Sequence, residues 1–407
     1  MDPVTLGFAL LLVLGLVGTD AMLHSGAVTV DLEVGADSSL QGVGEAFAEA
    51  LMCAEIQRII DTKSIFHVPQ LRGAREPSVA TSLTDWLKLR ELAHAVQLAF
   101  GAQSAQVRAS VSGDYRHKKL VVLGHSSYSR SFTVEIVSTP EEPTVDLLRR
   151  AAFEIAIQLE PYFAALHRVE EAAEGAATDE ARRLLERLIE TSPPLPRDPR
   201  RARFLNLLGI VELLDGRQER AGAHFAEALR VYPDSGVLGL NLGFVDIREG
   251  RIDAAIERLD ALVKNTELRR NPLLLAAAKS TLATAHVARG DHRAAESAFA
   301  AAARAYPQSS VVYDTWSRYR AERGDAAGAE RFAGQARANA MYFETYPELA
   351  LLHFQLSWRR DQPLARSPWR NPDRPPSQSG GLWSRLTGAA GGFFNRLDPR
   401  PDAAAIR

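Results

Sequence analysis

The chain has 407 residues, 46% of them hydrophobic, which is enough for two or three structural units with their own cores. It carries 48 Lys and Arg against 50 Asp and Glu, a formal net charge of −2, so no global field favours nucleic acid and none is expected as a partner. The single cysteine, Cys53, excludes an intrachain disulfide, and its apolar helical surroundings predict a small core residue.

Residues 1–25 predict a membrane segment. The apolar run at 4–17 reads VTLGFALLLVLGLV, and a membrane span needs about 20 apolar residues, a length that this run reaches only by extending past Asp20. One interpretation is an uncleaved single-pass transmembrane helix in the cell membrane. A second is a signal peptide cut near Ala21, although the charged region that such a peptide needs is missing, and a third is a buried helix. No Lys or Arg precedes Arg58, so the side of the membrane that the rest of the chain faces stays undetermined.

Residues 26–161 predict a small α/β domain. Apolar residues that alternate with polar ones indicate half-buried strands, and apolar residues at helical spacing indicate helices. The expected elements are strands at 28–34, 64–68, 105–111, 119–123 and 132–137, and helices at 40–60, at 83–100 and from 144 onward. This order favours an α/β sandwich with its helices on one face of the sheet.

The sequence contains no catalytic constellation. The stretch GHSSY at 124–128 lacks the second glycine of a nucleophile elbow and joins two strands rather than a strand and a helix. His117 and His125 flank one strand, but no carboxylate or cysteine completes a metal set at usable spacing. We therefore expect no enzyme activity, no catalytic residues, no metal site and no cofactor.

A pattern with a step of 34 residues recurs within 202–358. Gly216 and Gly250 are separated by this step, and so are Gly290 and Gly324. A period of about 34 residues is typical of stacked helix–turn–helix units, which bind other proteins. An insertion at 264–272 interrupts the period, and we expect it to form a surface loop.

This part of the chain resembles tetratricopeptide repeats. Their consensus has large residues at positions 4, 7 and 24, small ones at 8, 20 and 27, Gly at 15 and Pro at 32. Counting from Ala202, the chain supplies Leu205, Leu208, Gly209, Gly216, Ala221, Phe225, Ala228 and Pro233 at these positions. The unit from 310 departs from the consensus, with Trp316 and Ser317 where Leu and Gly are usual. The resemblance implies an all-α solenoid of four repeats over 202–358.

Flanking segments complete the expected array. Residues 162–201 are interpreted as degenerate capping helices and a prolyl linker, and 344–358 as a helix that covers the last apolar face. Residues 359–407 are interpreted as a disordered linker and a possible amphipathic tail, because 359–381 are rich in Pro, Arg and Ser. The stretch at 382–397 fits an interfacial membrane helix or a partner-binding motif, or, because of Gly388, Gly391 and Gly392, a tail without stable structure.

The resemblance also implies where a partner binds. In tetratricopeptide arrays the first helix of each pair lines a concave groove, and positions 2, 5, 9 and 12 face that groove. The corresponding residues are Arg203, Asn206, Leu240, Phe244, Ser280, Thr284, Asp314 and Arg318. They lack the Lys and Asn set with which charged grooves of this family hold a terminal carboxylate. We therefore expect a protein or peptide partner, bound as a helix or as an extended segment.

A second resemblance concerns residues 28–170. The order of elements and the Pro161–Tyr162 corner resemble the TolB-N-like α/β domain of bacterial membrane-anchored repeat proteins, which implies an envelope or membrane-scaffold role. The sequence therefore predicts a membrane-tethered tetratricopeptide repeat scaffold or adaptor. The alternative is an envelope sensor, in which the α/β domain binds a ligand and the repeats relay the signal.

Overall fold

The computed structural model describes residues 27–34, 43–66, 73–74, 105–113, 118–126, 131–140, 142–192, 197–339 and 346–350. The expected membrane segment at 1–25, the expected helix at 83–100 and the expected disordered region at 359–407 lie outside these ranges. Within them, no helix combines the length and the apolar character that crossing a bilayer requires.

A small mixed sheet forms the first part of the described chain. Its strands are β1 (Ala27–Val34), β2 (Gly73–Ala74), β3 (Ala105–Gly113), β4 (Lys118–Ser126) and β5 (Phe132–Val137). Their order across the sheet is β2-β1-β3-β4-β5, in which β1 is parallel to both of its neighbours and β3, β4 and β5 form an antiparallel meander. The strands expected at 28–34, 105–111, 119–123 and 132–137 are thereby confirmed.

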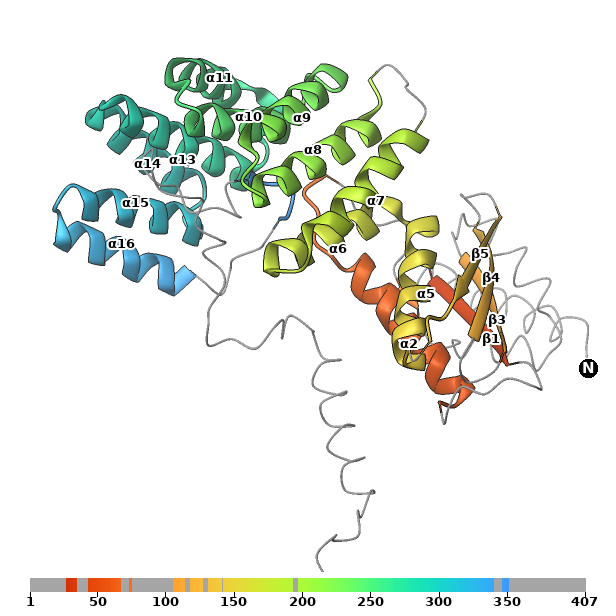
Figure 1. Cartoon of the computed structure of the whole chain (residues 1–407). Helices are drawn as coiled ribbons and strands as arrows, with labels where there is room; N and C mark the ends of the chain where they lie inside the picture. Colours follow the sequence, from red (N-terminus) through yellow and green to blue (C-terminus); the bar gives the residue numbers. More distant parts are fainter. Residues whose placement is uncertain are drawn as a thin grey trace, which may run out of the picture.

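Two helices, α2 (Glu45–Ile60) and α5 (Thr144–Leu159), pack on one face of this sheet (Figure 1). Side chains of β3 alternate as the pattern predicts, because Val107, Ala109 and Val111 are buried against these helices while the residues between them are exposed. The described part of the α/β unit therefore has the expected two layers, a sheet and helices on one face.

The strand expected at 64–68 is wrong for the residues that the structure describes. Residues 61–66 form turns and bends after α2, and the backbone N–H of Ile65 donates to the side chain of Glu348 instead of to a neighbouring strand. A distant part of the chain thus satisfies the donor that a strand would have used.

Helix pairs follow and stack into a tetratricopeptide-like solenoid (Figure 1). The pairs are α6 (Pro161–Glu174) with α7 (Thr178–Thr191), α8 (Pro199–Leu214) with α9 (Gln218–Val231), α10 (Gly236–Arg248) with α11 (Ile252–Lys264), α13 (Pro272–Arg289) with α14 (His292–Ala305), and α15 (Ser310–Glu322) with α16 (Ala326–Asn339). The turns within these pairs contain a glycine in the left-handed region, with φ of +113°, +76°, +77°, +83° and +77° at Gly175, Gly216, Gly250, Gly290 and Gly324.

Close packing of the two helices in each pair explains why the repeat consensus has small residues at some positions and large residues at others. A Cβ atom added to Gly209 would lie 2.4 Å from the ring of Phe225, and one added to Gly243 would lie 3.0 Å from Leu259. In the unit that departs from the consensus, the Ser317 hydroxyl donates to the backbone carbonyl of Ala329 at 2.8 Å. Ser317 therefore replaces the usual glycine with a hydrogen bond between the two helices.

The insertion at 264–272 is more than a surface loop. It contains a short helix, α12 (Thr266–Arg269), whose Leu268 is 2% exposed and packs against the backbone of Gly236. The expectation of a plain loop fails because this one leucine gives the insertion an anchor in the core.

One hydrophobic core runs from the α/β unit into the solenoid. Ile59, Ala156 and Ile157 belong to the same buried cluster as residues of α6, α8 and α10. Glu160 ends α5 and begins α6, so a single residue separates these two helices. The α/β unit and the first helix pairs are therefore packed together, not joined by a free linker.

Candidate functional site

The most informative contacts of the solenoid are made by a short segment from the end of the described chain. Residues 346–350, here called the tail segment, have the sequence Tyr-Pro-Glu-Leu-Ala and lie across α8 and α10 (Figure 1). The side-chain amides of Asn206 and Asn241 both donate to the carbonyl oxygen of Glu348, at 3.0 and 2.7 Å. The backbone N–H of Ala350 donates to Oδ1 of Asn241 at 2.9 Å.

These bonds hold the peptide backbone on both sides of Leu349. An asparagine amide carries both donors and an acceptor, so Asn241 can pair with a carbonyl and with an N–H of one chain segment. The segment forms a turn here, because the Leu349 N–H also donates to the Tyr346 carbonyl at 3.0 Å. The side of α8 and α10 that carries Asn206 and Asn241 is called the asparagine face below. It binds main-chain atoms, which every peptide has.

Both asparagines are completely buried between apolar neighbours on their helices. A buried amide without a hydrogen-bond partner destabilises a protein by about 1–3 kcal/mol. A further bond, from Nδ2 of Asn241 to Oδ1 of Asn206 at 2.8 Å, fixes the orientation of the second amide. The pair is therefore set in place to receive a peptide, and it is left with unmet donors when none is bound.

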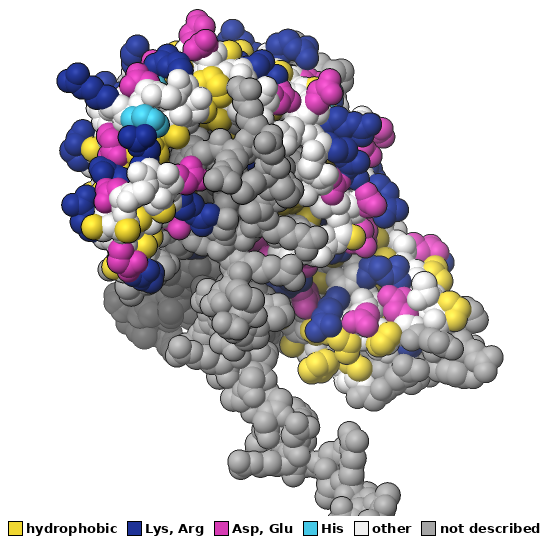
Figure 2. All heavy atoms as spheres, turned by 60° about the vertical axis from the view of Figure 1, so that its left-hand side comes forward, with side chains coloured by type: hydrophobic (Ala, Val, Ile, Leu, Met, Phe, Trp, Pro, Cys, Tyr) yellow, Lys and Arg dark blue, Asp and Glu magenta, His cyan; other side chains and the backbone are white. Residues whose placement is uncertain are grey.

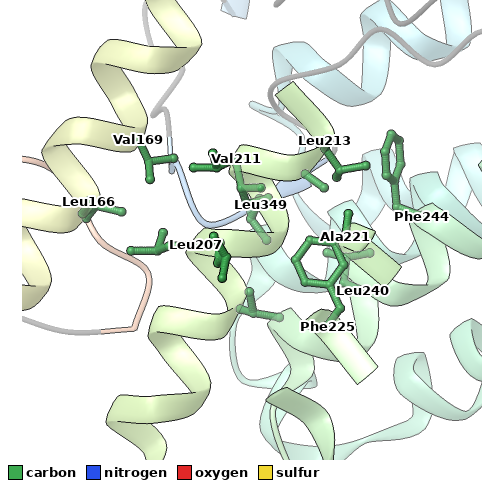
Figure 3. Close-up of a cluster of buried hydrophobic side chains, with 14 of the residues drawn as sticks. Leu166, Val169, Leu207, Val211, Leu213, Ala221, Phe225, Leu240, Phe244 and Leu349 are labelled. Atoms are coloured by element: carbon green, nitrogen blue, oxygen red, sulfur yellow. The ribbon is translucent and has the colours of Figure 1, made fainter. Parts of the chain in front are cut away.

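The side chain of Leu349 is fully buried in the main apolar cluster of the solenoid. Figure 3 shows it among side chains of α6, α8 and α10, including Leu207, Val211 and Leu240. Fully burying a leucine contributes about 1.5–3 kcal/mol. Ala350, which follows it, is also fully buried. The tail segment is thus part of a core, not a chain lying loosely on a surface.

Glu348 is fully buried as well, and its carboxylate has donors from two parts of the molecule. Oε1 accepts from the hydroxyl of Tyr162 at 2.9 Å and from the backbone N–H of Ile65 at 3.1 Å. The side chain of Ser64 also hydrogen-bonds to this carboxylate. Residues 64–65 come from the turn after α2 and Tyr162 from α6, so the α/β unit supplies part of this site.

Burial raises the pKa of the Glu348 carboxyl, and the hydrogen bonds from Ser64, Tyr162 and Ile65 only partly offset that effect. Burial also raises the pKa of Tyr162, and the neighbouring charge of Glu348 adds to it. The guanidinium of Arg203 lies 5.9 Å from the centroid of the Tyr162 ring and 5.7 Å from that of Phe66, at the distance of a cation–π contact.

The structure brings together only part of the set expected from the repeat positions. Asn206 binds the tail segment, Arg203 lies beside Tyr162, and Leu240 and Phe244 are buried in the cluster that contains Leu349. These four residues surround the tail segment or its apolar contacts.

The other four expected residues lie on α13 and α15. Ser280 and Thr284 are buried in α13, where the Thr284 hydroxyl donates to the Ser280 carbonyl at 3.0 Å. Asp314 and Arg318 are partly exposed on α15 and form an ion pair at 2.9 Å. Their role in partner binding stays a prediction.

The closing helix expected at 344–358 needs a correction for its five described residues. Residues 346–349 form a turn and Ala350 is the first helical residue, so within the described residues a helix begins later than expected. The segment's hydrogen bonds are to α6, α8 and α10 near the start of the solenoid. Burial of Leu349 among apolar side chains of several helices, together with the asparagine bonds, draws this segment inward.

Sequence reasoning did not single out Asn241, Tyr162 or Glu348 as members of one site. One signal was available, because Asn206 and Asn241 are 35 residues apart, nearly one repeat, and each interrupts an apolar stretch of helix. The repeat numbering places Asn241 at position 6, one residue beyond the position expected to face a partner.

Charge does not single out another surface on the part of the molecule seen in Figure 2. Basic and acidic side chains are interspersed over the visible helix pairs, without a large area of one sign. Among the described residues, no group of three or more His, Cys, Asp and Glu side chains is arranged to hold a metal ion. Burial raises the pKa of the Cys53 thiol, which disfavours the reactive thiolate.

No protein-family model and no curated protein matches the chain. Solved structures with similar parts include MamA (41-end) from Desulfovibrio magneticus RS-1, at 16% identity and a TM-score of 0.31, over 46% of this chain and 98% of that one. YrrB, described as a TPR protein with an unusual peptide-binding site, matches at 18% identity and a TM-score of 0.31, over 46% and 92% of the two chains. The APC/C hetero-tetramer Cut9–Hcn1 matches at 17% identity and a TM-score of 0.37, over 49% and 38%. Likenesses of this size do not bear on function.

Proposed function

We propose that this protein is a protein-interaction scaffold whose asparagine face binds the backbone of a short segment of a partner protein. The observation that carries the proposal is the pair of buried asparagines that bind the backbone of the tail segment. Hydrogen bonds to the main chain give affinity that does not depend on the partner's side chains, and the apolar cluster around Leu349 adds a site for one side chain. The tail segment occupies the face as an internal peptide, and a partner segment takes its place.

A test of this proposal has to reduce competition from the tail segment, which occupies the same face. A tethered segment acts at an effective concentration in the millimolar range when its linker is short, so it weakens the binding of a free peptide. The full chain with Glu348→Ala and Leu349→Ala, here called the tail variant, loses two buried side chains of the internal peptide, so its tail should dock more weakly and a free peptide should be able to displace it from the asparagine face.

The probe is a fluorescent peptide with the sequence of residues 342–352 (YFETYPELALL). We expect saturable binding to the tail variant, measured by fluorescence anisotropy, and much weaker binding to the unchanged chain. Asn206→Ala and Asn241→Ala, added together to the tail variant, should abolish it. Arg337→Ala, at an exposed position of α16, is the matched control and should leave the affinity unchanged. Absence of saturable binding to a folded tail variant would refute the proposal.

Attachment to a membrane through residues 1–25 is a separate proposal, which rests on the apolar run in the sequence. Fractionation of cells that express the chain with and without residues 4–17 tests it. We expect the full chain in the membrane fraction after a carbonate wash and the shortened chain in the soluble fraction. Recovery of both in the same fraction would refute membrane attachment through this run.

A further inference from the structure

The Glu348 side chain makes contacts that backbone recognition alone does not require. Asn206 and Asn241 bind the carbonyl of this residue and would do so whatever its side chain. The carboxylate is nevertheless fully buried. Burying a carboxylate is unfavourable unless hydrogen bonds or charges compensate, so the donors around it indicate a site built for this group.

The three donors around the Glu348 carboxylate come from two parts of the structure, α6 and the turn after α2. The Tyr162 hydroxyl and the Ile65 N–H both reach Oε1, and the Ser64 side chain is a further partner. One of these donors belongs to the main chain, so side-chain variation at position 65 does not remove it. Because the carbonyl and the carboxylate of one residue are bound at the same time, the register of the bound segment is fixed at Glu348.

The next two positions add a size requirement. Leu349 fills the apolar cluster beside Leu207 and Val211, while Ala350 is fully buried and its N–H is held by Asn241. A larger side chain in place of Ala350 has to displace packed atoms, and overpacking of this kind destabilises by about 1–3 kcal/mol. A short, ordered set of preferences therefore follows along the bound chain: a carboxylate, a leucine and a small residue.

We infer that the asparagine face selects partner segments that carry a Glu–Leu–Ala sequence in the turn conformation of the tail segment, with the glutamate bound by Tyr162, Ser64 and the Ile65 N–H. This inference rests on the proposed function and states the chemistry of its partner. The α/β unit then contributes to specificity. Its turn after α2 binds the glutamate side chain, while the solenoid binds the backbone of the segment. The partner's segment and the tail segment compete for one site because they share these three residues.

The test compares peptides on the tail variant of the full chain. The unchanged peptide is measured against peptides in which Glu348 is replaced by Ala or Gln, Leu349 by Ala, or Ala350 by Leu. Glu→Ala leaves the buried donors around this side chain without an acceptor, so we expect it to weaken binding roughly tenfold to a hundredfold. Glu→Gln should weaken it less, because the amide oxygen still accepts. Leu→Ala and Ala→Leu should each weaken it by about tenfold or more.

A double-mutant cycle distinguishes direct recognition from a change in fold. Tyr162→Phe in the tail variant should weaken binding of the Glu peptide several-fold and leave binding of the Ala peptide unchanged. Ser64→Ala is a second receptor variant with the same expectation, in case Tyr162→Phe unfolds. Equal loss for both peptides, or equal affinity of the Glu and Ala peptides, would overturn the assignment.

The outcomes separate this inference from the proposed function. If the asparagine substitutions abolish binding while the peptide glutamate has no effect, backbone recognition stands and glutamate selection fails. If no peptide binds, the proposed function itself fails. If light scattering shows that the unchanged chain forms dimers that the tail substitutions dissolve, the site belongs to a second copy of the chain, and the assignment to a partner is overturned.

Discussion

Asn206 and Asn241 show how a single residue type links folding to binding at this site. Each amide is buried on a helix whose other residues are apolar, and each gains its main partners from a chain segment more than a hundred residues away. The same side chains that hold the tail segment would be left unsatisfied without it, and an unsatisfied buried amide destabilises by about 1–3 kcal/mol. An empty asparagine face is therefore unstable, and this favours exchange of one peptide for another over a vacant site.

A second residue-scale feature, the glycine that lets paired helices touch, leads to a stability prediction. Gly209→Ala places a methyl group 2.4 Å from the ring of Phe225, which is fully buried and cannot turn away. We expect the free energy of unfolding, measured by urea denaturation, to fall by about 1–3 kcal/mol.

Gly334→Ala is the matched control, because a methyl group there meets nothing closer than 3.9 Å and the residue lies within α16. Alanine is a better helix former than glycine, so this change should raise the free energy of unfolding by about 0.5–1 kcal/mol. The two Gly→Ala substitutions should thus change the free energy of unfolding in opposite directions. A loss of stability in both variants would contradict the assignment of packing to Gly209 and of helix propensity to Gly334.

At the scale of elements, ion pairs recur at one place in the repeat. Glu212 pairs with Arg217, and one step of 34 later Asp246 pairs with Arg251. In the last unit the charges are exchanged, because Arg320 pairs with Asp325 at 2.8 Å. Each pair connects the end of a first helix with the start of the second one, across the glycine turn. The position, and not the sign of each charge, is what the repeat retains.

The pair at Asp246 predicts non-additive substitutions. Its carboxylate is nearly buried and accepts from Arg251 at 2.6 Å and from Arg258 at 3.1 Å. Removing either arginine leaves one partner, whereas removing both leaves a buried carboxylate unpaired, which destabilises by about 3–5 kcal/mol. We expect Arg251→Ala with Arg258→Ala to destabilise by more than the sum of the single changes in urea unfolding. Arg293→Ala, at an exposed position of α14, is the control, and strict additivity would contradict the expectation.

The elements that could be predicted from sequence are those built by contacts at fixed local spacing. Gly209 and Phe225 occupy set positions of one unit, so the period identifies them, and the alternation along β3 identifies its buried face. The tail segment has no such signal, because its contacts join residues 107 and 283 positions apart, Asn241 and Ile65 with Glu348. The strand expected at 64–68 is wrong for the same reason. A repeat position was sufficient to find Asn206 but not its partner peptide.

At the scale of the whole molecule, a polar chain connects the α/β unit to the solenoid beside their shared core. Thr62 hydrogen-bonds to Nδ1 of His167 at 3.1 Å, and Nε2 of His167 lies 3.3 Å from Oε1 of Glu171. Burial alone would raise the pKa of Glu171, but the hydrogen bond and charge of His167, together with the charge of Arg168, outweigh it and lower that pKa to about 2. Arg58 of α2 also lies 3.7 Å from this carboxylate.

This lowered pKa predicts how the joint between the two units responds to acid. A carboxyl with a lowered pKa in the folded state contributes stability that is present above its ordinary value of 4.5 and is lost as the pH falls toward 2. Glu171→Gln should therefore destabilise the chain at pH 6 and much less at pH 3, by urea unfolding at each pH. Glu330→Gln, at an exposed site on α16, is the control. A difference that stays constant between pH 6 and pH 3 would contradict the role of this charge.

Glu348 gives the opposite sign, so pH separates docking of the tail segment from stability of the joint. Its pKa is raised when it is buried, so the bound state favours the protonated carboxyl, and docking is strongest below the ordinary value of 4.5. The affinity should fall as the pH rises through the raised pKa and then become constant. Of the groups that bind this carboxyl, Tyr162 keeps its proton because its own pKa is raised well above 10, and Ser64 and the Ile65 N–H are neutral. Peptide binding to the tail variant should therefore weaken as the pH rises above 4.5, by at most about tenfold per pH unit, until the raised pKa is passed. The Glu→Gln peptide, which has no proton to lose there, should bind with the same affinity throughout, and a parallel decline for both peptides would assign the pH dependence to another group.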